Sequence, residues 1–158
     1  MILSIHAIVG AVLASNSNSI GQAIILGLVS HYFLDSIPHV EYTIKNIQKG
    51  DLKTAIKEFV NISIDLIVSL AILLYLIQNK NFDQTILILT GSFFALLPDG
   101  LYFIDCLVKN KNRNIFTKFL KMHSDFHAKT HSNIASFKIQ LITQIIIALA
   151  LLFFILFK

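Results

Sequence analysis

The sequence contains few of the residues that break helices or cross-link chains. Its 158 residues include one cysteine, two prolines, six glycines and no tryptophan. The single cysteine, Cys106, excludes a disulfide within the chain, so redox chemistry does not indicate a compartment. With so little proline and glycine, few helices are interrupted. We find no alternating strand pattern and no internal repeat, and we expect a single helical domain over residues 1–158.

Charge is also scarce, and apolar residues take its place. Charged residues make up 14% of the chain and hydrophobic residues 55%, above the 45–50% typical of soluble domains. Three stretches, 60–78, 85–104 and 136–157, each carry one charge and are about long enough to span a bilayer. Two shorter apolar runs, 1–14 and 20–37, predict a re-entrant or tightly packed hairpin. We therefore predict an all-α, multi-helix integral membrane bundle, with a soluble helical bundle as the alternative.

The basic residues are distributed unevenly around these stretches. Eleven of the thirteen lie in residues 43–58 and 105–138, which the three spans would place on one side of the membrane. By the positive-inside rule, this predicts a multi-pass protein of the inner (cytoplasmic) membrane with cytoplasmic basic loops. Membrane lipid is the expected partner. Nucleic acid is not expected, because basic residues beside a span are more typical of lipid contact. The predicted helices cover 2–14, 20–37, 52–79, 83–108, 112–122, 124–132 and 134–157.

Ionisable side chains inside the apolar runs are the most informative feature. They are His6, His31, Asp35, Asp65 and Asp99. Each is costly at membrane depth, but a divalent cation would offset the cost if they converged. His31 and Asp35 are four residues apart, so they share one helix face and can chelate one ion.

Other histidines extend this spacing. His39 continues the His31–Asp35 ladder, but it follows Pro38, so it is either a loop ligand or a surface group. A second ladder comprises His123, His127 and His131. Its sequence is more polar, so we predict His127 and His131 as candidate ligands and His123 as a solvent-exposed bystander. Pro98 and Gly100 predict a helix that is broken or kinked around Asp99.

Four pieces of the sequence resemble one family. They are Ser4-Ile-His-Ala-Ile-Val-Gly10, Gly27-Leu-Val-Ser-His-Tyr-Phe-Leu-Asp35, Leu97-Pro-Asp99 and His127-Ala-Lys-Thr-His-Ser132. Together they resemble the YdjM-like membrane-bound, metal-dependent hydrolases, which are placed near the zinc-dependent phospholipase C and P1 nuclease superfamily. The resemblance implies that the metal ligands are His6, His31, Asp35, Asp99 and one or both of His127 and His131.

The resulting hypothesis is a membrane-bound hydrolase that uses a divalent metal, zinc or else manganese, to cleave a phosphoester, for example an anionic phospholipid. Asp65 is the candidate catalytic residue: it, or a further histidine, would complete the metal shell or act as general base. One alternative is a metal-binding or metal-transport protein without hydrolysis, with haem ligation as a variant. Another is a structural membrane protein whose polar groups only cross-link helices.

Overall fold

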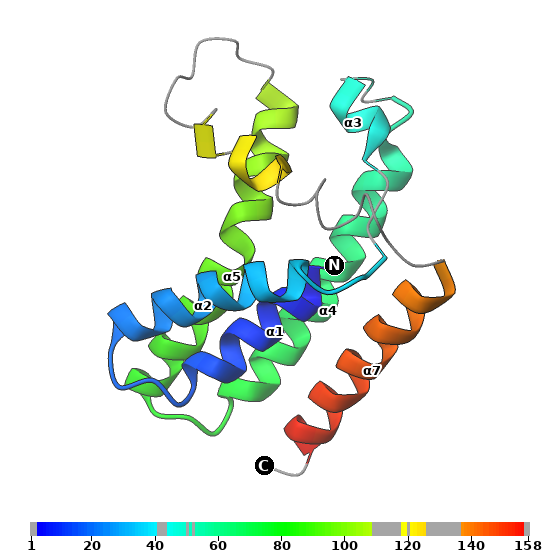
Figure 1. The fold of residues 1–158 in the computed structure, drawn as a ribbon. Helices are drawn as coiled ribbons and strands as arrows, with labels where there is room; N and C mark the ends of the chain where they lie inside the picture. The colour runs from blue at the N-terminus through cyan, green and yellow to red at the C-terminus, as the bar shows by residue number, and fades with distance from the viewer. Residues whose placement is uncertain are drawn as a thin grey trace.

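The fold is all-helical across the part of the chain that the computed structural model describes, which is residues 3–40, 44–49, 51, 53–108, 118–119, 121–125 and 137–156. This confirms the predicted all-α class. The short helix α3 was not predicted, and most of the two helices expected between 112 and 132 lies outside the described residues. The helices (Figure 1) are α1 Leu3–Ala14, α2 Ile20–Asp35, α3 Lys45–Lys49, α4 Ile56–Ile77, α5 Phe82–Val108 and α7 Phe137–Leu156.

Helix α1 is the centre of the bundle. It packs against α5, α2 and α4, and its buried side chains point in every direction around its axis, with Ala7, Ala11 and Ala14 fully buried. A helix that is apolar all round is expected in a core. Helices α4 and α5 run up and down the page in Figure 1, whereas α2 lies across them. Helices α1 and α2 contact each other, as expected for a hairpin of the two short apolar runs.

Three glycines allow these helices to approach closely. A Cβ atom on Gly10 of α1 or on Gly27 of α2 would lie 2.5 Å from the carbonyl oxygen of Gly91 in α5. A Cβ atom on Gly91 would in turn overlap Ala14. Small residues at such crossings are typical of membrane helices. This crossing brings the C-terminal half of α2 alongside residues 95–99 of α5.

Helix α5 is continuous through Pro98. Of the two predicted alternatives, a break at Asp99 is therefore wrong, and a kink there stays a prediction. A proline lacks the backbone N–H that would donate a hydrogen bond within the helix. Packing against neighbouring helices can stabilise the helix despite this loss. Here α1 and α2 both pack along α5. Asp99 is therefore presented from within a helix.

Helix α7 stands to one side of the other helices (Figure 1). Its residues Ile147 and Leu151 pack against buried Ile5 and Leu34. It also holds the segment that follows α2. The Thr143 hydroxyl donates a hydrogen bond to the carbonyl oxygen of Pro38, and Gln144 Oε1 accepts one from the Val40 backbone N–H at 3.1 Å.

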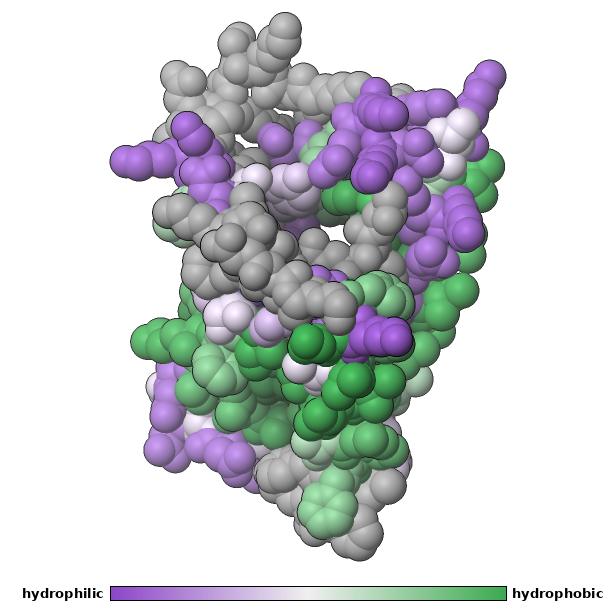
Figure 2. Space-filling model, turned by 45° about the vertical axis from the view of Figure 1, so that its right-hand side comes forward, coloured by the Kyte–Doolittle hydropathy of each residue, from purple (hydrophilic) through white to green (hydrophobic). Residues whose placement is uncertain are grey.

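Much of the surface is apolar. Figure 2 shows a hydrophobic band below a hydrophilic upper end, with a second hydrophilic patch at the lower edge. Large aliphatic side chains of α4 and α7 are exposed in this way, among them Ile67, Leu70, Ile146 and Leu149. Two helices, Ile56–Ile77 and Phe82–Leu107, are long and apolar enough to cross a membrane.

Candidate metal centre

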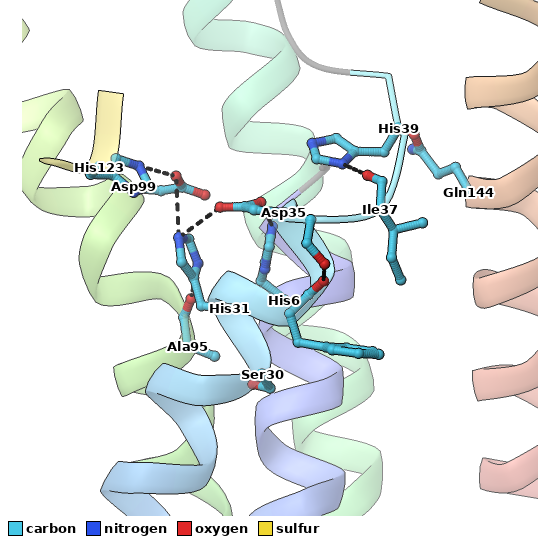
Figure 3. Close-up of polar contacts among 12 residues, drawn as sticks. His6, Ser30, His31, Asp35, Ile37, His39, Ala95, Asp99, His123 and Gln144 are labelled. Carbon is cyan, nitrogen blue, oxygen red and sulfur yellow. Dashed lines mark hydrogen bonds and ion pairs between the residues drawn. The ribbon is translucent and has the colours of Figure 1, made fainter. Parts of the chain in front are cut away.

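Five imidazole and carboxylate groups meet where α1, α2 and α5 cross (Figure 3). His6 comes from α1, His31 and Asp35 from α2, Asp99 from α5 and His123 from the segment 121–125. His6, His31 and Asp35 are fully buried, and His123 is 2% exposed. The Asp99 side chain is 21% exposed, so it lies at the edge of the cluster that solvent reaches.

The ligand-type atoms face one another. Asp35 uses both oxygens, with Oδ1 lying 3.2 Å from His6 Nε2 and Oδ2 lying 3.0 Å from His31 Nε2. Asp99 Oδ1 lies 3.2 Å from His123 Nε2 and 3.9 Å from His31 Nε2. The two carboxylates are thereby linked through the His31 ring.

The tautomer of His31 follows from its other contact. Its Nδ1 lies 2.8 Å from the carbonyl oxygen of Ala95. A carbonyl oxygen only accepts, so Nδ1 must carry the hydrogen and donate it. In a neutral ring, Nε2 then has a lone pair, and this lone pair faces the cluster. Metal-binding histidines commonly donate their second nitrogen to a backbone carbonyl in this way.

Electrostatics favour a cation between these atoms. A neutral His31 would direct its lone pair at a carboxylate oxygen only 3.0 Å away, which is repulsive unless a proton or metal ion lies between them. Protonating both His6 and His31 would bury two positive rings whose centroids are 4.6 Å apart. Three neutral imidazoles and two carboxylates sum to −2, which one divalent ion neutralises.

The spacing also suits a metal ion. Two donors bound to zinc at about 2.0–2.1 Å with tetrahedral angles lie about 3.3 Å from each other. The four nitrogen–oxygen separations of 3.0–3.9 Å lie around this value. In each of two sets, His6 with His31 and Asp99, and His31 with Asp35 and His123, the donor atoms lie within 4.8 Å of one another. The structure thus contains His/Asp groups that could hold a metal ion.

Two tyrosines pack around the cluster. The Tyr32 ring meets His31 edge-on at 5.2 Å between centroids, and both Tyr32 and Tyr102 lie 6.1 Å from the His123 ring. Apolar ring surface beside a metal site restricts solvent and strengthens electrostatic interactions within it.

The structure brings together four of the residues that the sequence predicts as ligands: His6, His31, Asp35 and Asp99. The predicted ligands His127 and His131 lie outside the described residues. Their roles therefore stay predictions.

The expectation for His123 was wrong. This side chain is buried and contacts Asp99, whereas the polar sequence around it predicted a solvent-exposed position. Its described neighbours Lys121, Met122 and Ser124 are exposed. The polar sequence therefore predicts the exposure of the segment correctly, but not the burial of the His123 side chain. The one feature of the sequence that could have identified His123 as a member of the site is its spacing of four residues from the candidate ligand His127.

His39 is neither a surface group nor a member of the two three-residue sets. It is 1% exposed, and its Nδ1 lies 2.6 Å from the carbonyl oxygen of Ile37, to which it must donate. Figure 3 shows this nitrogen turned towards Ile37, away from Asp35. Pro38 ends the helical register, so the third position of the ladder leaves the face shared by His31 and Asp35.

The predicted base, Asp65, is buried in a different setting. Its Oδ2 accepts a hydrogen bond of 3.0 Å from the backbone N–H of Ser4, in the first turn of α1. The first backbone donors of a helix have no partner within the helix, so Asp65 anchors the start of the helix that carries His6. A catalytic role for Asp65 stays a prediction.

Comparison with known proteins identified no relative of this chain. No model of a known protein family matches the chain, and neither a curated protein nor a solved structure is significantly similar to it.

Proposed function

We propose that this protein is a membrane-bound, metal-dependent hydrolase that acts on a phosphoester. The observation that carries the proposal is the convergence of His6, His31, Asp35, Asp99 and His123 in a mostly buried cluster. Buried groups of this kind are costly unless they are paired or bind a metal. Five ionisable side chains from four separate segments of the chain meet in one cluster, which favours a functional site over scattered cross-links between helices.

Zinc is the proposed metal, with manganese as the second choice. Imidazole nitrogen and carboxylate oxygen together suit zinc. His31 is oriented by Ala95 and Asp35, so part of the ligand set is preorganised. A bound metal would supply a water of lowered pKa and polarise a phosphoryl oxygen.

The residues of the cluster would have different roles in this reaction. His6, His31 and Asp35 are closed to solvent and would hold the ion. Asp99 is partly exposed at the edge of the cluster, where water and substrate would enter. A catalytic metal site needs such an open position, whereas a structural one is closed.

A membrane location is part of the proposal. The exposed aliphatic residues of α4 and α7 and the hydrophobic band in Figure 2 support it, as do the two helices of sufficient length. The exposed lysines Lys49, Lys53 and Lys57 gather around α3 and the start of α4, at the upper end of Figure 1. That end is the proposed cytoplasmic side.

The test compares wild type with His31→Ala, both purified from membranes in mild detergent. We expect wild type to retain zinc or manganese by elemental analysis and to cleave a chromogenic phosphodiester. His31→Ala should lose both properties. Metal-free wild type would contradict the site. A metal-loaded protein that cleaves no phosphoester but carries metal into vesicles would support transport instead.

A further inference from the structure

A second site lies away from the metal cluster, where α1 ends and α4 turns into α5. A partly open cavity of about 190 Å³ is formed there by the C-terminal halves of α1 and α4, by α5 and by Ile155 of α7. In Figure 1 this turn is at the lower end of the molecule, whereas α3 and its lysines are at the upper end.

The walls of this cavity change character from inside to outside. Ala11 and Ile88 are buried and make its apolar inner part. The outer part is polar, with Gln78, Asn79 and Lys80 from the turn that follows α4. An apolar interior with a polar edge at the end of membrane-length helices matches the depth at which lipid headgroups meet acyl chains.

Lys80 gives the cavity its charge. Among the described residues Lys80 makes no ion pair, and the nearest acid in the sequence, Asp83, does not line the cavity. The ammonium group and the neighbouring side-chain amides supply hydrogen-bond donors for an anion. Basic pockets between membrane helices bind lipid headgroups on the cytoplasmic side of membranes, and Lys80 offers the same charge to a lipid phosphate at the opposite end.

We propose that this cavity binds the phosphate headgroup of an anionic membrane phospholipid, with Lys80 as the main contact. Its acyl chains would extend over exposed aliphatic side chains such as Leu74 of α4 and Leu152 of α7. A free phosphate would leave the apolar inner wall uncovered, so the lipid is the better match. The inference rests on the proposed membrane location, but it does not depend on the metal centre.

The test uses the full chain reconstituted in vesicles of phosphatidylglycerol and phosphatidylcholine, then released for native mass spectrometry. Wild type should retain phosphatidylglycerol in preference to phosphatidylcholine. Lys80→Ala should retain about fivefold less, as expected for one lysine at an anionic membrane. Lys53→Ala, at the opposite end of the molecule, controls for loss of one surface charge and should retain more phosphatidylglycerol than Lys80→Ala.

A second variant tests the cavity itself. Val12→Phe places a larger side chain on the cavity wall and should also lower retention. Equal retention by Lys80→Ala and wild type would overturn the proposal. So would loss in Lys80→Ala with full retention in Val12→Phe, because the lipid would then bind to surface charge alone. A chain that does not enter vesicles would refute the membrane location itself, and with it this site. Metal content measured on the same samples reports separately on the metal centre.

Discussion

Two pairs of acids in this protein are surrounded by different partners. Asp35 and Asp99, on α2 and α5, face imidazole nitrogens. Glu58 and Asp65, on α4, face backbone N–H groups. The Glu58 oxygens accept from Asn46 and Ile47 of α3, each at 3.0 Å, and Asp65 accepts from the first turn of α1.

The difference shows that burial alone does not identify a metal ligand. The α4 acids stabilise helix ends because the first backbone donors of α1 and α3 would otherwise have no partner. The acids of α2 and α5 meet ring nitrogens, one of which, His31 Nε2, must present a lone pair when the ring is neutral. An acid among backbone donors is already satisfied, whereas the His31 lone pair that faces Asp35 needs a proton or a metal ion between the two groups.

The largest effect is expected when an acid of each pair is substituted and metal binding is measured. Asp35→Ala removes a carboxylate that contacts two imidazoles and should lower zinc affinity by more than about 100-fold, beyond the 10–100-fold typical of outer-shell changes. Asp65→Asn should leave metal content unchanged. Competition with a zinc chelator measures both. Equal metal loss in the two variants would remove the distinction between the pairs.

The role of His123 offers a second test. His123→Ala should lower zinc affinity by about 10–100-fold, because Asp99 and the buried residues of α1 and α2 remain. It should also speed tryptic cleavage at Lys121, since His123 is the buried contact of segment 121–125. Adding a chelator to wild type should reproduce the faster cleavage. Cleavage that is insensitive to both changes would show that His123 does not hold this segment.

The close crossing of α1 and α5 determines how near His6 of α1 and Asp99 of α5 come. Gly91→Ala would force a methyl group against Ala14 and the Gly10 carbonyl, so α1 and α5 must separate. We expect a loss of about 1–3 kcal/mol in unfolding free energy, together with weaker metal binding. Gly100→Ala, on the same helix with nothing within 4 Å, is the control. Unfolding in an SDS titration provides the measurement, and equal behaviour of the two variants would contradict the crossing.

Stability should depend on the structural acids. Asp65→Ala leaves the buried Ser4 N–H without an acceptor, which should cost about 1–3 kcal/mol. Asp65→Asn keeps an acceptor oxygen and should cost less. If Asp65→Asn folds and binds metal but no longer hydrolyses a phosphodiester, Asp65 is also the catalytic base. If its hydrolysis is unchanged, the catalytic prediction is wrong and the anchoring role remains.

An effect no larger than that of Asp65→Ala is expected at Glu58. Glu58→Gln keeps one acceptor oxygen, but its NH2 group cannot accept from the second α3 N–H, so stability should fall by about 1–3 kcal/mol. Thermal unfolding of detergent-purified protein should detect this decrease, with Asp83→Asn, which removes only an exposed charge from the first turn of α5, as the control with a smaller effect. A decrease in metal content in Glu58→Gln would mean that the two pairs of acids are coupled.

Much of the fold could be predicted because helix formation is local. The apolar runs placed α1, α2, α4, α5 and α7 within a few residues of their observed bounds. The helix α3 was missed because its five residues carry no apolar period, and Glu58 was missed with it. Glu58 satisfies the start of α3 from α4, a contact between separate elements that no short window of sequence contains.

The sequence by itself determined the helical class, the apolar surface and the shared face of His31 and Asp35, because a spacing of four residues fixes direction within one helix. Only the tertiary structure decided that His6, Asp99 and His123 join that face, that Asp65 anchors α1, and that His39 turns to Ile37. The physical reason is that these outcomes depend on the crossing of α1, α2 and α5 at Gly10, Gly27 and Gly91, and on chain segments that fold back from a distance.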